Sequence, residues 1–118
     1  MTDKLFATIW ADACASADVD AFASDWSLSS ALLPDGEDID AELVAQLRVM
    51  WHVAHDPFKE LLRAMGLTQA RCVTRFCIPL RTVQDWAGAR SKCAPYIRLM
   101  MAEAMGLLTV RGYAQTSG

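Results

Sequence analysis

The sequence has no hydrophobic run near the length that a membrane span requires. A transmembrane helix needs about 20 consecutive apolar residues, and polar or charged side chains interrupt this 118-residue chain well before that length. The first residues, Met1-Thr2-Asp3-Lys4, also lack the basic and then apolar pattern of a secretion signal. We therefore expect a cytoplasmic protein that does not bind membranes.

The sequence also lacks a close pair of cysteines of the kind that binds zinc. Without an export signal, we expect the thiols to be reduced. A zinc site would have to combine Cys72, Cys77 and Cys93 with a histidine. Cys72, however, falls on the inward face of a predicted helix, where a free cysteine behaves as a small hydrophobe. His52 and His55 are three residues apart, but Asp56 is the only further ligand type beside them. We therefore predict no metal site and no cofactor. The four cysteines are Cys14, Cys72, Cys77 and Cys93.

No arrangement typical of a catalytic site is present. The sequence contains no glycine-rich phosphate loop and no cluster of metal ligands at the expected spacing. It also has no Ser, His and Asp set that stands out from its many scattered acidic residues. Asp18, Asp20 and Asp25 are better interpreted as solvated or capping residues. We therefore do not expect an enzyme.

Basic residues are scarce in the first half of the chain and concentrated in the second. Residues 1–58 hold Lys4 and Arg48 against eleven acidic residues, a net charge of −9. Residues 59–98 hold eight basic residues against two acidic ones, a net charge of +6, and the whole chain carries −3. Binding to nucleic acid phosphates needs a local rather than a global positive field. The simpler alternative is that the arginines only solvate amphipathic helices, but the sharp boundary favours a nucleic-acid partner. The eight basic residues are Lys59, Arg63, Arg71, Arg75, Arg81, Arg90, Lys92 and Arg98.

Residues 67–86 have the pattern of two short helices joined by a tight turn, with the first helix ending near Phe76 and the second beginning at Pro79. Helices that cross steeply touch at only a few positions, and those positions must be apolar. The inward set is Cys72, Val73, Phe76, Ile78, Val83 and Trp86. The second helix then presents a different set to the solvent: Leu80, Arg81, Thr82, Gln84 and Asp85, with Arg90 past its end.

Two segments of this unit, Leu67-Thr68-Gln69 and Thr82-Val83-Gln84-Asp85-Trp86, resemble the Cro/cI-like (XRE) helix-turn-helix family. The resemblance covers roughly residues 58–99, and the chain is also similar to small helix-turn-helix proteins of bacterial mobile elements and phages. Three positions depart from the family pattern: Val73 replaces an alanine, Cys77 the turn glycine and Ala87 a glutamate. Cys77 conflicts most with the pattern, because that turn position often has a positive φ. A slightly different turn geometry would relieve the conflict.

The resemblance implies binding to double-stranded DNA, with the helix over 79–87 in the major groove. We predict base contacts from Leu80, Arg81, Thr82, Gln84 and Asp85, with Arg81 and Gln84 as the main candidates. Phosphate contacts are predicted for Gln69, Arg71, Arg75, Arg90 and Lys92. One monomer reads only ~4–5 base pairs, so we expect a homodimer on an inverted repeat. The expected function is that of a sequence-specific transcriptional regulator of the repressor type.

An interaction protein is the alternative from another class. Antitoxins and phage counter-defence proteins of this build join a DNA-binding module to a part that binds a toxin or a nuclease. The acidic residues 1–58 could bind such a protein partner, and the helix-turn-helix would then serve autoregulation.

Apolar residues elsewhere recur at three- and four-residue steps, which predicts an all-α fold: a small helical bundle with the helix-turn-helix module in its C-terminal half. We expect helices over residues 3–14, over 17–26 with Ser16 as N-cap, from 39 or 41 to about 55 with Asp38 or Asp40 as N-cap, over 58–65 and over 95–107. Thr8 and Ile9 leave a strand possible in the first of these. The expected organisation is an acidic N-terminal helical segment over 1–33, a linker over 34–38, the DNA-binding domain over 39–108 and a flexible tail over 109–118.

Overall fold

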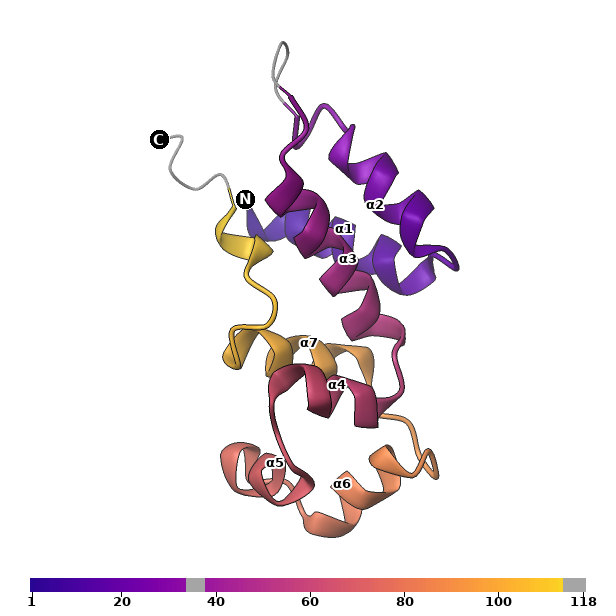
Figure 1. Cartoon of the computed structure of the whole chain (residues 1–118), viewed down its shortest axis with the longest axis vertical. Coiled ribbons are helices and arrows are strands. Elements are labelled where there is room, and N and C mark those ends of the chain that lie inside the picture. The colour runs from indigo at the N-terminus through magenta and orange to yellow at the C-terminus, as the bar shows by residue number, and fades with distance from the viewer. Residues whose placement is uncertain (34–37, 114–118) are drawn as a thin grey trace.

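The computed structural model describes residues 1–33 and 38–113, and within these ranges the regular elements are seven α-helices and one short 3-10 helix. The predicted all-α fold is confirmed (Figure 1). Of the linker expected over 34–38, residues 34–37 lie outside the described part of the chain. None of the described helices is both long enough and apolar enough to cross a membrane.

Three helices form the N-terminal end of the molecule: α1 (Asp3–Ala15), α2 (Val19–Ser27) and α3 (Ala41–His55). Each begins at a polar cap whose side chain accepts backbone N–H groups of the first turn, namely Thr2, Asp18 and Asp40. The cap expected at Ser16 is therefore wrong. Asp18 takes that position because its carboxylate accepts the N–H of Asp20 at 2.9 Å and interacts favourably with the helix dipole. The strand alternative for the first segment is also excluded.

The core of this end lies between the three helices, and its largest fully buried side chains are Phe6, Ile9, Phe22, Leu43, Leu47 and Met50. α3 packs mainly against α2 and α1, and it also contacts α7 (Pro95–Ala104). Residues 41–55, which we assigned to the DNA-binding domain, thus share their core with the acidic N-terminal helices.

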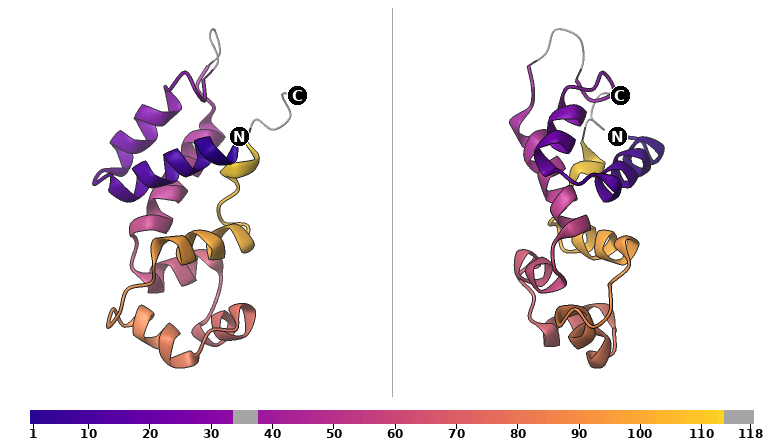
Figure 2. Two further views of the ribbon diagram at one scale, coloured as in Figure 1. Left: turned by 180° about the vertical axis from the view of Figure 1, so that it is seen from behind. Right: turned by 90° about the vertical axis from the view of Figure 1, so that its right-hand side faces the viewer.

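The second end consists of α4 (Phe58–Met65), α5 (Gln69–Phe76) and α6 (Leu80–Ala87), and α7 packs between this end and α3. Figure 2 shows α1–α3 at one end of the long axis and α5 and α6 at the other, with α4 and α7 at middle height. The molecule is elongated, with extents of 51 × 30 × 22 Å.

α7 ends at Ala104, three residues before the expected end at 107. Gly106 adopts φ +74°, and the N–H groups of Leu107 and Gly106 bond back to Ala102 and Glu103, which is a Schellman-type termination. The chain then turns so that Leu108 and Val110 are buried, each about 2% exposed.

The flexible tail expected from residue 109 is therefore corrected over 109–113. Val110–Gly112 forms the 3-10 helix η1, and the Met1 ammonium donates to the Tyr113 carbonyl at 2.6 Å. Arg111 pairs with Glu103 and Asp3, and its guanidinium lies 3.8 Å from the centroid of the Phe6 ring. Residues 114–118 lie outside the described chain.

Candidate nucleic-acid interface

α5 and α6 pack against each other and are joined by residues 77–79. The Thr68 hydroxyl caps α5 by accepting the N–H of Arg71 at 3.1 Å. Cys77 ends α5 in the left-handed conformation (φ +55°), so the turn keeps its positive φ rather than changing geometry. This conformation lets the Val73 carbonyl accept N–H groups from both Cys77 and Ile78. α6 begins at Leu80, one residue later than expected, with Pro79 as its N-cap.

The residues predicted to face inward do so. Cys72 and Val83 are fully buried, and the other four are partly buried against the core. The Trp86 ring meets the Phe58 ring of α4 edge to face, with centroids 5.2 Å apart. These contacts hold α6 by one face and leave the opposite face to the solvent.

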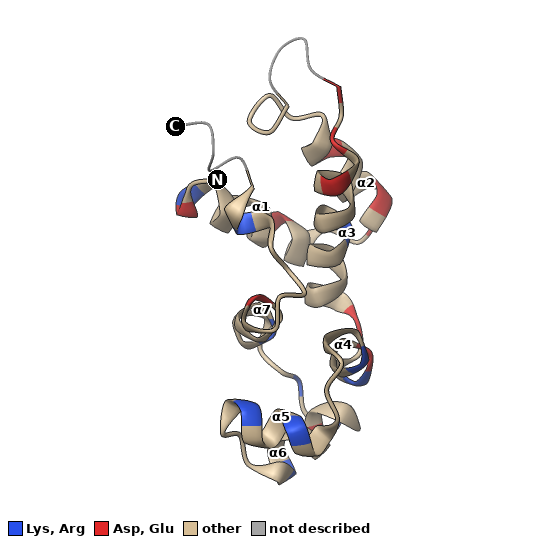
Figure 3. Ribbon diagram, turned by 60° about the vertical axis from the view of Figure 1, so that its left-hand side comes forward, with Lys and Arg blue, Asp and Glu red and all other residues tan. Residues whose placement is uncertain are grey.

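The predicted base-contact residues differ in exposure. Arg81, Gln84 and Leu80 are exposed, with the Arg81 side chain 78% accessible. Thr82 is half-buried. Figure 3 shows Asp and Glu concentrated on α2 and α3, whereas Lys and Arg predominate on α4 and α5, and α6 carries one Arg and one Asp. The acidic helices lie at the other end of the molecule and do not cover this face.

Asp85 is already engaged within the protein. Its carboxylate lies 3.2 Å from Arg81 Nε and 3.7 Å from Arg90 Nη1, and its backbone carbonyl accepts the N–H of Arg90 at 2.8 Å. The two arginines are therefore held side by side around one carboxylate. This geometry suits Asp85 for orienting Arg81 and Arg90.

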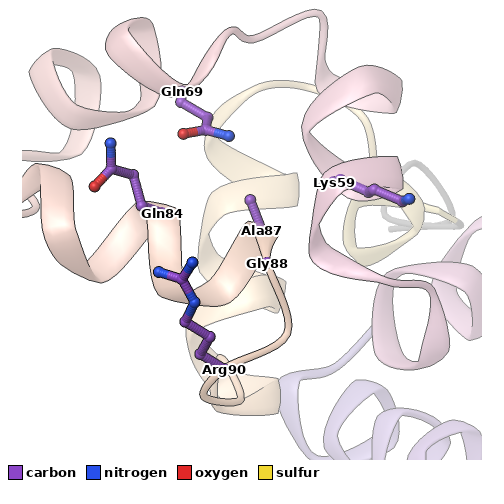
Figure 4. Close-up of a pocket in the computed structure, with 6 residues that line it drawn as sticks. All are labelled: Lys59, Gln69, Gln84, Ala87, Gly88 and Arg90. Carbon is purple, nitrogen blue, oxygen red and sulfur yellow. The ribbon is translucent and has the colours of Figure 1, made fainter.

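The predicted phosphate-contact residues are all exposed but fall into separate groups. Gln69, Gln84 and Arg90 line one open pocket of about 440 Å³ between α4, α5 and α6, together with Lys59, Ala87 and Gly88. Figure 4 shows the two amides and the Arg90 guanidinium on one side and Lys59 of α4 on the other. Arg71 and Arg75 line a different hollow with Leu67 and Thr74, and Lys92 lies in the loop before α7.

Lys59 is the residue of this pocket that our sequence reasoning did not assign to the interface. Its sequence position puts it in the basic segment over 59–98, without a contact assigned to it. Packing of α4 on α6 brings Lys59 to the same pocket as Gln69 and Arg90. None of the six lining residues is acidic. Arg90 and the two amides can donate to an anion such as a phosphate group, and Lys59 lies at the rim of the pocket with its ammonium directed away from them (Figure 4).

The histidines and the core cysteines are occupied by protein contacts. His52 Nδ1 lies 2.9 Å from the Asp56 carboxylate, and His55 Nε2 lies 2.7 Å from the Ala13 carbonyl. Burial raises the pKa of Cys72, and it raises that of Cys93 to about 11, so both thiols are protonated at neutral pH. No group of three potential metal ligands occurs among the residues that the structure describes.

The fold and this site define a class: an all-helical protein with a basic, polar face built on two short crossing helices. No protein-family model, curated protein or solved structure matches the chain.

Proposed function

We propose that the chain is a sequence-specific, double-stranded DNA-binding protein of the helix-turn-helix class, acting in the cytoplasm as a transcriptional regulator of the repressor type. The observation that carries the proposal is the exposed polar face of α6. Arg81 and Gln84 stand there beside a pocket lined by Lys59, Gln69 and Arg90. Cations and amides on one open surface are what a duplex contacts.

In this proposal α6 lies in the major groove. Arg81 would donate two hydrogen bonds to a guanine edge, and Gln84 would donate to and accept from an adenine edge. Leu80, 50% exposed at the start of the helix, suits apolar contact with a thymine methyl group. Asp85 would orient Arg81, because it already holds that guanidinium at 3.2 Å.

The surrounding residues would bind the sugar-phosphate backbone. The pocket of Lys59, Gln69 and Arg90 would take one phosphate at the start of α5, whose N-terminal N–H groups add a favourable dipole. Arg71 and Arg75 make no ion pair with any described residue and are free for further phosphates. The acidic helices are at the far end of a 51 Å molecule, well beyond the ~8 Å Debye length of physiological salt.

A homodimer on an inverted repeat completes the proposal. One α6 reads about 4–5 base pairs, which is too short a sequence for useful selectivity in a genome. Two copies related by a two-fold axis would double the number of base pairs that are recognised.

The test compares Arg81→Ala with Lys92→Ala in a binding selection from random duplexes at two salt concentrations. Arg81→Ala should relax the base preference at one position of each half-site, with a loss of about 1–3 kcal/mol for the preferred base. Lys92→Ala should weaken binding to all sequences alike and lower the salt slope by about one unit.

The unchanged protein should select a two-fold symmetric site. Equal loss across all sequences from both variants would contradict the assigned division between base and phosphate contacts. Absence of salt-dependent binding to any duplex would overturn the DNA-binding proposal as a whole.

A second candidate function is recognition of a basic protein by the acidic end, with the DNA-binding face used for autoregulation. It is favoured by exposed carboxylates that no described residue neutralises, among them Asp25, Asp38 and Glu42. The triple variant Asp25→Asn, Asp38→Asn and Glu42→Gln should lose a co-purifying basic protein and keep its affinity for DNA. If the triple variant retains the same partner, the acidic end is not the contact.

A further inference from the structure

A groove separate from the polar pocket lies between the C-terminal end of α5, α6 and α7. Its volume is about 460 Å³, and seven apolar residues and one arginine line it. Phe76, Ile78 and Trp86 supply one wall, and Ile97 and Met101 of α7 supply the other. The proposed contacts to DNA use none of these apolar side chains.

Arg75 is the charged residue of this groove. It makes no ion pair with a described residue, whereas Arg63 and Arg81 are paired with Glu60 and Asp85 on their own helices. Its guanidinium lies 5.4 Å from the centroid of the Phe76 ring, so it sits at the edge of the apolar wall. A free guanidinium beside aromatic and methionine side chains offers an anion site next to an apolar surface.

We propose that this groove binds a small amphiphilic carboxylate, an aromatic or medium-chain aliphatic acid. The apolar body would pack between Trp86 and Met101, and the carboxylate would accept two hydrogen bonds from Arg75. Methionine side chains adapt readily to an irregular ligand, and Met101 lies beside Met100, which is 59% exposed.

The size of the groove favours such a ligand over a second copy of the chain or a protein helix. Small-molecule sites have volumes of roughly 300–1,000 Å³, which includes this one. A stable protein interface takes about 20–30 residues from each partner, and eight residues line the groove. The α7 wall runs from Ile97 to Ala104, two turns or about 11 Å of helix.

The site would also couple to the DNA-binding face, because Arg75 is one of the predicted phosphate contacts. A carboxylate bound to its guanidinium would withdraw that charge from the duplex. This coupling rests on the function proposed above, whereas binding of the acid does not, so binding is measured in the absence of DNA.

The full chain is titrated with octanoate and with octanamide, its neutral counterpart. Binding is measured by calorimetry and by the NMR signals of the Trp86 indole and the Met101 methyl group. Octanoate should saturate the site and bind about tenfold or more tightly than the amide.

Arg75→Gln should reduce octanoate affinity to that of the amide. Arg71→Gln, a matched change of an exposed and unpaired arginine on the same helix, should leave octanoate binding unchanged. Ala104→Phe, which fills the groove from an exposed position, should abolish binding of both probes.

Three results would overturn the proposal. One is the absence of saturable binding by octanoate and by naphthalene-2-carboxylate. Another is an equal loss of affinity in Arg71→Gln and Arg75→Gln, which would indicate a non-specific charge effect. The last is a dimer in sedimentation analysis that Ala104→Phe dissociates, because a second copy would then cover the groove.

Discussion

Cys77 has a backbone conformation that residues with a Cβ atom seldom adopt. Its φ of +55° and ψ of +42° place it in the left-handed region, where a non-glycine residue is strained by roughly 1–2 kcal/mol. The strain persists because the turn satisfies the last carbonyls of α5 and directs the chain into α6. Cys77 is also the position that conflicts most with the family pattern, and the structure keeps its positive φ instead of a different turn geometry.

Replacing Cys77 with glycine should therefore stabilise the protein. We expect Cys77→Gly to raise the free energy of unfolding by about 0.5–1 kcal/mol, since glycine adopts positive φ without a Cβ clash but loses more chain entropy on folding. Urea denaturation measures the change. Cys77→Ala is the matched control and should give no comparable gain, because alanine keeps the Cβ atom. Equal stability of the glycine and alanine variants would show that the turn is not strained.

At the scale of elements, α7 is attached to α3 by a buried charge. Arg98 is 8% exposed, and its Nε donates to the Val53 carbonyl at 2.7 Å while Nη2 donates to the Asp56 carbonyl. Burial lowers the pKa of Arg98 from its ordinary value, although Cys93, Asp56 and Cys14 oppose that shift. The carbonyls at the C-terminal end of α3 carry partial negative charge, and so they accommodate the guanidinium. Arg98 thus does not belong to the basic surface in which its sequence position placed it.

Removing the Arg98 guanidinium should destabilise the contact between α7 and α3. Arg98→Met keeps an apolar stem of similar length but leaves two carbonyls without their donor, which should cost about 2–4 kcal/mol of unfolding free energy. Arg48→Met serves as the comparison, because Arg48 is an exposed arginine paired with Asp20 and its loss should cost about 0.5 kcal/mol or less. Denaturant unfolding of both variants measures the difference. A similar loss of unfolding free energy in the two variants would show that the buried Arg98 guanidinium does not stabilise the contact between α7 and α3.

At the scale of the whole molecule, the two described ends of the chain meet on the acidic half. The Met1 ammonium binds the Tyr113 carbonyl, and the Tyr113 hydroxyl donates to the Asp40 carboxylate at 2.9 Å. Arg111 bridges Asp3 of α1 and Glu103 of α7. These contacts draw residues 109–113 across α1 and α3, so the segment expected to be free becomes part of the packing.

The Asp40 contact predicts a dependence of stability on pH. The hydrogen bond from Tyr113, aided by the backbone N–H of Glu42, lowers the pKa of Asp40. A lowered folded-state pKa contributes stability that is present above the unfolded value of about 3.9 and is lost as the pH falls through the folded value. Tyr113→Phe should therefore be less stable than the unchanged protein at pH 7, and the gap should narrow on acidification to about pH 2.5.

Denaturant unfolding at the two pH values checks this expectation. Tyr96→Phe, at an exposed tyrosine of α7, is the control and should show little difference at either pH. A gap between Tyr113→Phe and the unchanged protein that stays constant with pH would mean that the hydroxyl does not act through the Asp40 carboxylate.

Local signals in the sequence are sufficient to predict the helices of the second end and their inward faces. The apolar spacing of residues 58–87, the Thr68 cap of α5 and Gly66, which ends α4 with φ +71°, are local signals. Local hydrogen bonds and side-chain periodicity decide whether a short segment is helical. Tertiary structure alone decided which distant residues meet: Lys59 with Gln69 and Arg90, Arg98 with the end of α3, and Val110 with the core. These long-range contacts depend on the angles at which the helices pack. The packing angles depend on how many side chains from different helices fit together, and no single segment of the sequence encodes them.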